Sequence, residues 1–554
     1  MTDSWRGAGS NGCLLGPSTR VLTPRQERSA KSESLPVDLI TILVFLGLAL
    51  LVWDCIEVGR NDASNIVNAV FGARILNRRT AVRVAGLAVV IGASAASPVF
   101  ETARKGIFDP GMLTLEQAVI AYISVYLVDT VLLFTYSAFG MPVSTTACLI
   151  FELVGASVGL YGLSVVHWGK VGTVIAAIFV SIFMTGLAGF LIQRVFRAAI
   201  GTKIDDRETI LLHGPWISGF MLTGLGWFMV FKGMSAIPFV NAFREYAIDP
   251  YIDAFTPTFA FLSAWGLFTL IVHLFLSFSG TIGTRYLFPA MAVLGMICLA
   301  FAFGQNDLAN CASPGISAFW LWRHAEQTVA QATQITIPTW VLFICGCLLV
   351  AGMMTENAQR VTRAQVNVGS QFDRVALYAP EWCRAMARAL LRFFPHRPEL
   401  APPPMVSPQG KKVHYDALRA AVISSVSAGV IALASSRGLP VSTTYVAFAA
   451  VIATGLADRV LARGDADLKI GRAIWVVVSW FLAAIIAVVA TAGVARLIYH
   501  LGFVGLLSAL AINLSVRFYS QKVADEQERR IHRHRGGQPP VDQLAKTEIH
   551  ADVP

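Results

Sequence analysis

The chain has 554 residues, of which 55% are apolar and only 14% are charged, and its mean hydropathy is +0.61. Soluble domains carry about 25% charged residues, so this composition excludes a water-soluble globular protein and indicates an integral membrane protein in a lipid bilayer. The formal net charge of +10 comes mostly from segments outside the apolar runs. Such basic segments are typical of the cytoplasmic side of a membrane, and without a folded basic module we expect no nucleic-acid partner.

Apolar runs recur along the chain, and a helix needs roughly 20 such residues to cross a bilayer. Residues 1–38 are polar and predict an N-terminal tail without a cleaved signal peptide. The runs follow at 39–57, 81–97, 116–138, 142–163, 172–194, 215–233, 258–280, 285–304, 338–354, 416–435, 440–457, 473–497 and 499–515, before a basic polar tail at 516–554. We predict an all-α membrane protein with about 10–13 transmembrane helices.

Two short motifs each occur twice, in the same order. The pattern Gly-x-Asn-Asp-x-x-Asn spans 59–65 and 304–310, and Pro-Val-Ser-Thr-Thr spans 142–146 and 440–444. Two different motifs repeated in one order indicate a duplicated chain. Polar segments that interrupt apolar runs at matching positions of two halves are typical of a transporter with broken helices around a midplane site.

The duplication predicts the domain organisation. We expect a first transmembrane repeat at 39–200, connecting transmembrane segments at 201–284, and a second repeat at 285–515 that contains a hydrophilic basic insert at 355–414.

The hydroxyl motif has the composition of an anion site. Its proline suits the first turn of a helix, and the hydroxyls would then lie beside free N–H groups at the positive end of the helix dipole. The candidate anion-binding residues are Ser144, Thr145, Thr146, Ser442, Thr443 and Thr444. Capping and packing by Ser and Thr is the alternative for one copy alone, whereas the duplication favours a tetrahedral oxyanion.

The Asn-Asp motif is better suited to a cation. A carboxylate at membrane depth is costly and usually functional, and an Asn three residues later shares its helical face. With nearby unwound carbonyls these groups could form an all-oxygen site. The candidate residues are Asn61, Asp62, Asn65, Asn306, Asp307 and Asn310, with sodium held at Asp62 and Asp307. Protonated aspartates would equally serve a proton-coupled carrier, and helix capping is the alternative role.

Further acidic residues lie in or near the apolar runs. Accessory candidates are Glu101, Asp129 and Glu152, each with a structural hydrogen bond as an alternative role. Asp54 and Glu57 are expected nearer a membrane interface, and Arg60 is expected to reach lipid headgroups. The cysteines show no metal-like spacing, so we expect no cofactor besides the coupling ion.

The motifs resemble those of the inorganic phosphate transporter (PiT) family, whose two inverted halves carry Gly-Ala-Asn-Asp-Val-Ala-Asn-Ala-like and Leu-Pro-Val-Ser-Thr-Thr-His-like motifs. The similar segments here are 304–310 with Pro314, 438–444 and 101–107. The resemblance implies two inverted repeats and a symporter that carries inorganic phosphate with sodium or protons, the Asn-Asp motifs serving the cation and the Ser-Thr-Thr motifs the phosphate. Arg60, Ser64, Ala147, Phe151, Glu152 and Tyr445 depart from the family pattern and indicate a divergent member.

Two other functions stay open. A sulfate or other oxyanion permease of the same fold is one alternative, and a transport-inactive membrane sensor or scaffold is the other, although both motif pairs are intact. An enzyme is not expected, because the chain has no metal-binding, nucleophile-elbow or Walker motif. The expected location is the cell membrane, namely a bacterial inner membrane, and a homo-oligomer stays open.

Overall fold

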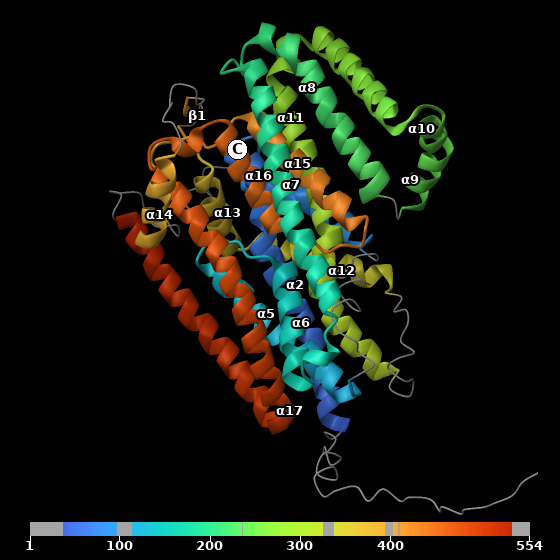
Figure 1. Ribbon diagram of the computed structural model, residues 1–554, viewed down its shortest axis with the longest axis vertical. Coiled ribbons are helices and arrows are strands. Elements are labelled where there is room, and N and C mark those ends of the chain that lie inside the picture. Colours follow the sequence, from blue (N-terminus) through green and yellow to red (C-terminus); the bar gives the residue numbers. More distant parts are fainter. Residues whose placement is uncertain are drawn as a thin grey trace, which may run out of the picture.

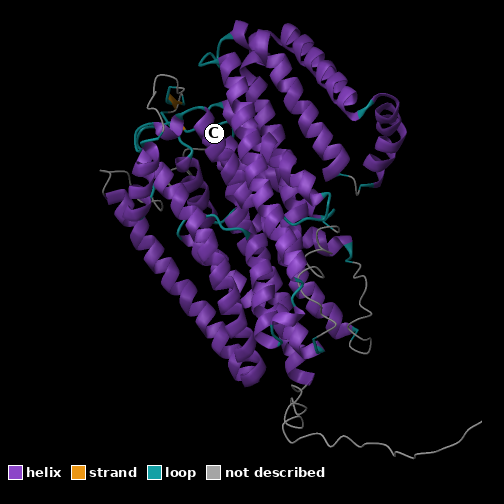
Figure 2. Ribbon diagram, in the orientation of Figure 1, coloured by secondary structure: helices purple, strands orange, loops and turns teal. Residues whose placement is uncertain are grey.

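A computed structural model describes residues 37–96, 113–234, 237–324, 337–393, 403–407 and 410–533. Helices dominate this part of the chain (Figures 1 and 2). The only sheet within it is an antiparallel pair of two-residue strands, β1 (Met405–Val406) and β2 (Lys412–Val413).

The α-helices follow one another along the described segments. In chain order they are α2 (Val37–Gly72), α3 (Arg78–Ala93), α5 (Leu115–Ala138), α6 (Thr145–Leu160), α7 (Trp168–Ile200), α8 (Arg207–Phe228), α9 (Pro238–Phe243), α10 (Asp249–Phe255), α11 (Pro257–Arg323), α12 (Thr339–Met353), α13 (Glu356–Val368), α14 (Glu381–Leu391), α15 (Ala417–Ser435), α16 (Thr443–Ala457) and α17 (Ala466–Arg533). The part predicted as a hydrophilic insert therefore contains α13, which packs on α2, and α14, which packs on α17.

Seven of the described helices are long and apolar enough to cross a membrane, namely α2, α5, α7, α8, α11, α15 and α17. Two of them are broken: at Gly280 in α11 and Gly502 in α17 the φ angles are +62° and +55°, a conformation that glycine adopts without strain. Each therefore contains two helical segments. The break in α11 lies at the end of the run 258–280, before the run 285–304, whereas the break in α17 lies three residues inside the run 499–515. The pair α12 and α13, bent by 68°, adds a broken or re-entrant element.

Helices α6 and α16 have 16 and 15 residues, fewer than the roughly 20 needed to cross a bilayer. The predicted fold class, an all-α multi-pass membrane protein with broken helices, is confirmed.

The helices divide into a buried centre and a lipid-facing exterior. In α5, 83% of the most apolar window is buried inside the protein, against 22% in α7 and 28% in α17. Helix α17 follows one side of the molecule in Figure 1. Since apolar side chains are compatible with lipid, the exposed faces of α7 and α17 are the expected lipid contacts.

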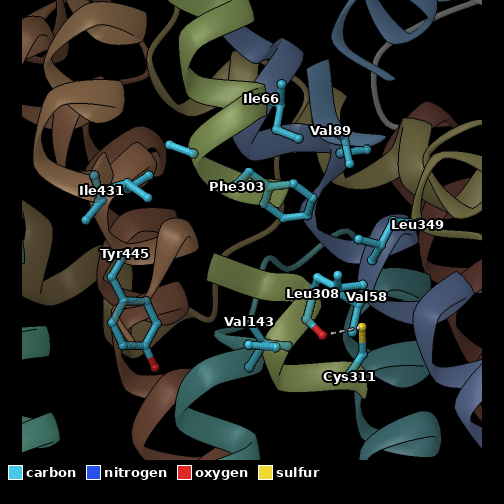
Figure 3. Packing of buried hydrophobic residues seen from close by; sticks show 14 of the residues in the cluster. Val58, Ile66, Val89, Val143, Phe303, Leu308, Cys311, Leu349, Ile431 and Tyr445 are labelled. Carbon is cyan, nitrogen blue, oxygen red and sulfur yellow. Dashed lines mark hydrogen bonds between the residues drawn. The ribbon is translucent and has the colours of Figure 1, made fainter. Parts of the chain in front are cut away.

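Each Asn-Asp helix packs against a helix of the other half. A Cβ atom added to Gly59 in α2 would lie 1.9 Å from the carbonyl oxygen of Leu349 in α12, and one added to Gly304 in α11 would lie 2.2 Å from that of Val89 in α3. Small residues allow such close backbone approach in membrane proteins. Side chains at both contacts are visible in Figure 3, where Val58 and Leu349 lie near each other. The reciprocal packing interlocks the two halves around the site.

Candidate functional site

Both Asn-Asp motifs lie inside continuous helix. Asp62 is in the interior of α2 and Asp307 is in the interior of α11, and both are fully buried. Neither aspartate caps a helix, and the backbone beside them is not unwound. The nearby unwound carbonyls that we expected belong to the loops before α6 and α16, where Asn61 Nδ2 lies 3.4 Å from the carbonyl oxygen of Met141 and Asn306 Nδ2 lies 2.7 Å from that of Val441.

Both hydroxyl motifs begin a short helix at the centre of the protein. Ser144 and Ser442 are the N-caps of α6 and α16, and their hydroxyls accept hydrogen bonds from the N–H groups of Ala147 (3.0 Å) and Tyr445 (3.1 Å). The prolines lie two residues before each cap, outside the helix, and not in its first turn as predicted. The other N–H groups of the first turns, which have no acceptor within their own helices, remain as donors for a ligand.

The two helix beginnings meet head to head. The Thr146 hydroxyl of α6 donates to the carbonyl oxygen of Val441 before α16 (3.0 Å), and the Thr444 hydroxyl of α16 lies 3.0 Å from the carbonyl oxygen of Val143 before α6. These residues are about 300 positions apart in the sequence, and they are related by the duplication.

The motif asparagines hold the loops in place. The Asn61 side-chain oxygen accepts from the N–H of Val143 (3.0 Å), and the Asn306 side-chain oxygen accepts from the N–H of Val441 (3.2 Å). The Asn306 amide also donates to the carbonyl oxygen of Val441 (2.7 Å). An asparagine can accept and donate at once, so one side chain fixes each non-helical loop. This explains structurally why an amide precedes each aspartate.

The first aspartate joins the two halves through the second hydroxyl motif. Asp62 Oδ1 accepts from Asn65 Nδ2 (2.7 Å) and lies 2.9 Å from the Thr444 hydroxyl. Asn65 Nδ2 also lies 3.0 Å from that hydroxyl.

The second aspartate mirrors this arrangement with the first hydroxyl motif. Asp307 Oδ1 accepts from the Thr145 hydroxyl (2.9 Å) and lies 3.3 Å from Asn310 Nδ2, which also donates to the Thr146 hydroxyl (2.7 Å). Asp62 and Asp307 are close enough to repel each other when both are ionised.

Four oxygens at this centre are buried without a hydrogen-bond partner among the described residues. They are Asp62 Oδ2, Asp307 Oδ2, Asn310 Oδ1 and Thr443 Oγ1. Buried polar atoms are normally paired, so four unpaired oxygens around two carboxylates call for a ligand. An oxygen-only donor set suits a hard cation, and a cation would also offset the repulsion between the aspartates.

All twelve motif residues predicted for the site are therefore buried in one region, but their hydroxyls are not all free. Two serines cap helices, and three threonines donate to groups of the protein; Thr443 alone has no partner in the described part of the chain. An anion bound here would have to take over hydrogen bonds that carbonyl and carboxylate oxygens now accept.

The other predicted acids occupy different places. Asp129 and Glu152 are buried, and Glu101 lies outside the described residues. Asp54 and Glu57, expected nearer a membrane interface, are 1% and 0% exposed and therefore lie inside the protein.

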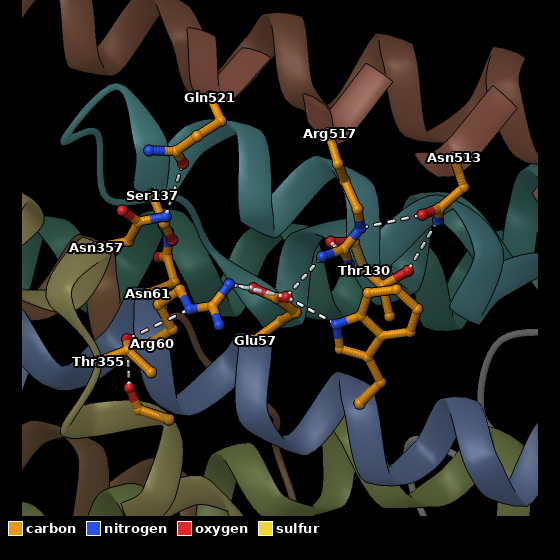
Figure 4. A network of polar contacts seen from close by, with 12 residues as sticks. Glu57, Arg60, Asn61, Thr130, Ser137, Thr355, Asn357, Asn513, Arg517 and Gln521 are labelled. Atoms are coloured by element: carbon orange, nitrogen blue, oxygen red, sulfur yellow. Dashed lines mark hydrogen bonds and ion pairs between the residues drawn. The ribbon is translucent and has the colours of Figure 1, made fainter. Parts of the chain in front are cut away.

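The predicted contact of Arg60 with lipid headgroups is wrong, because its guanidinium group binds Glu57. Figure 4 shows Arg60 directed at Glu57, at 2.8 Å, with Arg517 of α17 bound to the same carboxylate at 2.8 Å. Burying Glu57 requires compensating charge, and the two arginines supply it.

Sequence reasoning missed an aromatic contact beside the hydroxyl motifs. Tyr445, noted only as a departure from the family pattern, stacks on Trp480 of α17 with ring centroids 3.9 Å apart, and Trp480 Nε1 donates to the carbonyl oxygen of Pro142 (2.9 Å). Trp480 lies within an apolar run, and nothing in the sequence around it indicates a contact with a residue more than 300 positions away.

Comparison with known proteins agrees with this geometry. The sequence profile of the phosphate transporter family matches residues 58–367 and 405–493, most of the chain. The protein named “Putative phosphate permease” of Thermococcus kodakarensis is 27% identical over 468 residues, covering 84% of this chain and 98% of its own length. One with the same name from Chlamydia muridarum is 26% identical over 468 residues, covering 80% and 94%.

The fold also has a solved counterpart. The structure named “The sodium-dependent phosphate transporter” matches with a TM-score of 0.60 at 19% identity, covering 83% of this chain and 100% of that one. This likeness concerns the fold, whereas the profile match concerns the sequence itself. The chain belongs to the phosphate transporter family.

Proposed function

We propose that this protein is a secondary active transporter that carries inorganic phosphate across the cell membrane together with a cation. One observation carries the proposal: two helix N-termini from the two halves meet in the buried centre, beside two aspartates that each keep one unpaired oxygen. The relatives named as phosphate permeases support phosphate as the solute.

The anion is held by the beginnings of α6 and α16. N–H groups at helix N-termini attract negative charge, and the threonine hydroxyls add neutral donors with suitable reach. Phosphate displaces the hydroxyls of Thr146 and Thr444 from the carbonyl oxygens of Val441 and Val143, so binding is linked to a rearrangement of the contact between the halves.

The cation is held by Asp62 and Asp307. With both aspartates ionised and no cation, phosphate would meet two negative charges in a medium of low dielectric constant. A cation bound between the carboxylates removes this repulsion, which makes anion binding depend on cation binding. The all-oxygen donor set favours sodium, and the name of the structural relative agrees with this choice.

Uptake of radiolabelled phosphate into proteoliposomes tests the proposal, with sodium and proton gradients imposed separately. We expect gradient-driven accumulation in the wild type and its loss, by tenfold or more, in Asp307→Asn, which retains the size of the side chain but loses its charge. The exposed Asp253→Asn in α10 is the matched control and keeps full uptake. Full activity of Asp307→Asn would remove the second Asn-Asp motif from the mechanism.

Excess sulfate in the same assay separates phosphate from other oxyanions. Phosphate changes its protonation near neutral pH, whereas sulfate stays a dianion. Unchanged phosphate uptake in excess sulfate is the expected result, and strong competition would favour a general oxyanion permease.

A further inference from the structure

Three acidic side chains that belong to neither motif converge in the first half of the protein. Asp54 of α2, Asp129 of α5 and Glu152 of α6 are 1%, 5% and 0% exposed. The carboxyl groups of Asp54 and Asp129 lie within hydrogen-bonding reach of each other, and Glu152 interacts electrostatically with both. A hydrogen bond between two carboxyl groups needs a proton on one of them, because a carboxylate has no hydrogen to donate.

Four carboxyl oxygens of the cluster have no partner in the part of the chain that the structure describes. Asp54 Oδ1, Asp129 Oδ1 and both carboxyl oxygens of Glu152 are buried without a hydrogen-bond partner in the described residues. Glu152 is thus a completely buried acid, close enough to Asp54 and Asp129 to interact with both electrostatically. Three ionised carboxylates this close would repel one another strongly in the protein interior, so they must share protons or a cation.

No neighbouring cation is free to neutralise the cluster within the described structure. Arg517 of α17 interacts electrostatically with Asp54, but its guanidinium binds Glu57 of α2 (2.8 Å) and Asn513 (3.0 Å). Glu57 also pairs with Arg60, as Figure 4 shows. The other titratable neighbours are neutral groups, namely Cys55 of α2, Tyr126 of α5, Cys148 of α6 and Cys311 of α11.

The duplication shows that the fold does not require these acids. Leu299 precedes Asp307 by eight residues, as Asp54 precedes Asp62. Ser427 in α15 lies as many residues before Pro440 as Asp129 lies before Pro142. Ala450 in α16 lies as many residues after Pro440 as Glu152 lies after Pro142. The equivalent helices of the second half therefore pack with apolar or neutral side chains, so the carboxyls of the first half are not needed to form the helices.

The cluster is joined to the proposed phosphate site along α6. Glu152 lies seven residues after Thr145, two helical turns along the same face, and Cys148 lies between them. Cys148 is close enough to Asp62, Asp129 and Glu152 to interact electrostatically with each of them. A change of charge at Glu152 therefore acts on the helix whose first turn contacts Asp307.

We propose that Asp54, Asp129 and Glu152 form a proton-binding site, separate from the Asn-Asp motifs, that carries protons during transport. Its transport role rests on the proposed function. Each uptake event adds a proton to a carboxylate, and release returns it on the other side with the carboxylate regenerated. A proton is the ligand that the geometry supports, because the hydrogen bond between the carboxyl groups of Asp54 and Asp129 already requires one.

The transport test measures protons entering per phosphate in proteoliposomes with a pH dye in the lumen. We expect the ratio to fall in Glu152→Gln, while exchange of labelled for unlabelled phosphate continues. Protons that enter bound to phosphate itself are the same for the wild type and for Glu152→Gln, so they do not contribute to the difference between the two ratios. Ser427→Ala is the matched control in the second half and keeps the wild-type ratio. An unchanged ratio in Glu152→Gln overturns the proposal, and so does a variant that loses sodium dependence instead.

A second measurement is independent of transport. Infrared difference spectra of the purified wild type, titrated across neutral pH, should contain a protonated-carboxyl band that weakens in Asp54→Asn and in Glu152→Gln. If the wild type moves no phosphate, the proposed function fails, and this band still decides whether the cluster binds protons. The same spectrum in wild type and both variants would overturn the proton site.

Discussion

Neighbouring threonines at the beginning of α16 have different surroundings. The Thr444 hydroxyl lies 3.0 Å from Asn65 Nδ2 and 2.9 Å from Asp62 Oδ1. The Thr443 hydroxyl is buried and has no partner within the described residues. The first hydroxyl is thus part of the contact between the halves, and the second is available for a ligand.

Replacing each threonine by valine separates stability from binding. Thr444→Val leaves a buried amide and a carboxylate oxygen with fewer partners, which should lower the free energy of unfolding by about 1–3 kcal/mol. Thr443→Val should leave stability nearly unchanged and raise the KM for phosphate several-fold. Chemical unfolding in detergent and uptake kinetics measure the two effects. Equal losses of stability in both variants would contradict the division of roles.

At the scale of the helices, the close packing of α2 on α12 and of α11 on α3 depends on the glycine of each Asn-Asp motif. The space at Gly304 is closed by the backbone of α3, 2.2 Å from where a Cβ would be. Backbone atoms cannot rotate out of the way as the end of a flexible side chain can. A Cβ atom at position 304 would therefore force α3 and α11 to separate. The contact between Gly59 and α12 is equivalent.

Gly304→Ala should therefore lower the thermal unfolding temperature in detergent and reduce uptake, although alanine favours helix by about 1 kcal/mol. Gly186→Ala in α7 is the matched control, because a Cβ there meets no atom within 4 Å. We expect Gly186→Ala to match or exceed the wild-type unfolding temperature. A Gly304→Ala protein as stable as the control would show that the two helices can move apart without cost.

A buried ion cluster holds three helices together at the scale of the whole molecule. Arg197 of α7 pairs with Asp416, the N-cap of α15, and with Asp458 at the C-terminus of α16, where Nε lies 2.9 Å from Oδ1. Gln193 donates to Asp458 as well. This cluster fixes the far end of the helix whose first turn forms the site.

Arg197→Met should destabilise the protein by about 3–5 kcal/mol, since it leaves two buried carboxylates without their cation. Arg194→Met, one turn earlier and exposed, removes a single contact to the carbonyl oxygen of Ala457 and should cost far less. Thermal unfolding in one detergent compares the variants. Similar losses from both would mean that the cluster contributes no more than a surface contact.

Local patterns predicted the elements well wherever the decisive feature was local. Apolar runs marked the membrane helices, and the gaps between runs fell close to Gly280 and Gly502, where the backbone turns. The extension of α2 through its motif to Gly72 was not predicted, because buried polar residues interrupt hydropathy without interrupting a helix.

The site was predictable in its residues and not in its contacts. The repeated motifs singled out twelve side chains that are all buried in one region. Helix capping was the alternative role for the hydroxyl motif, and Ser144 and Ser442 have that role. The sequence could not tell which hydroxyls cap a helix, or that the Thr146 hydroxyl donates to the carbonyl oxygen of Val441. The partners of a side chain depend on rotamers and on groups hundreds of residues away.

By itself, the sequence determined that this is a duplicated membrane protein with two kinds of polar motif, because hydropathy and repetition are properties of the chain alone. Only the tertiary structure decided that α2 packs on α12 and α11 on α3, that the beginnings of α6 and α16 meet, and that Asp54, Asp129 and Glu152 converge. These outcomes depend on contacts between residues far apart in the sequence, where close packing and the pairing of buried polar groups select one arrangement.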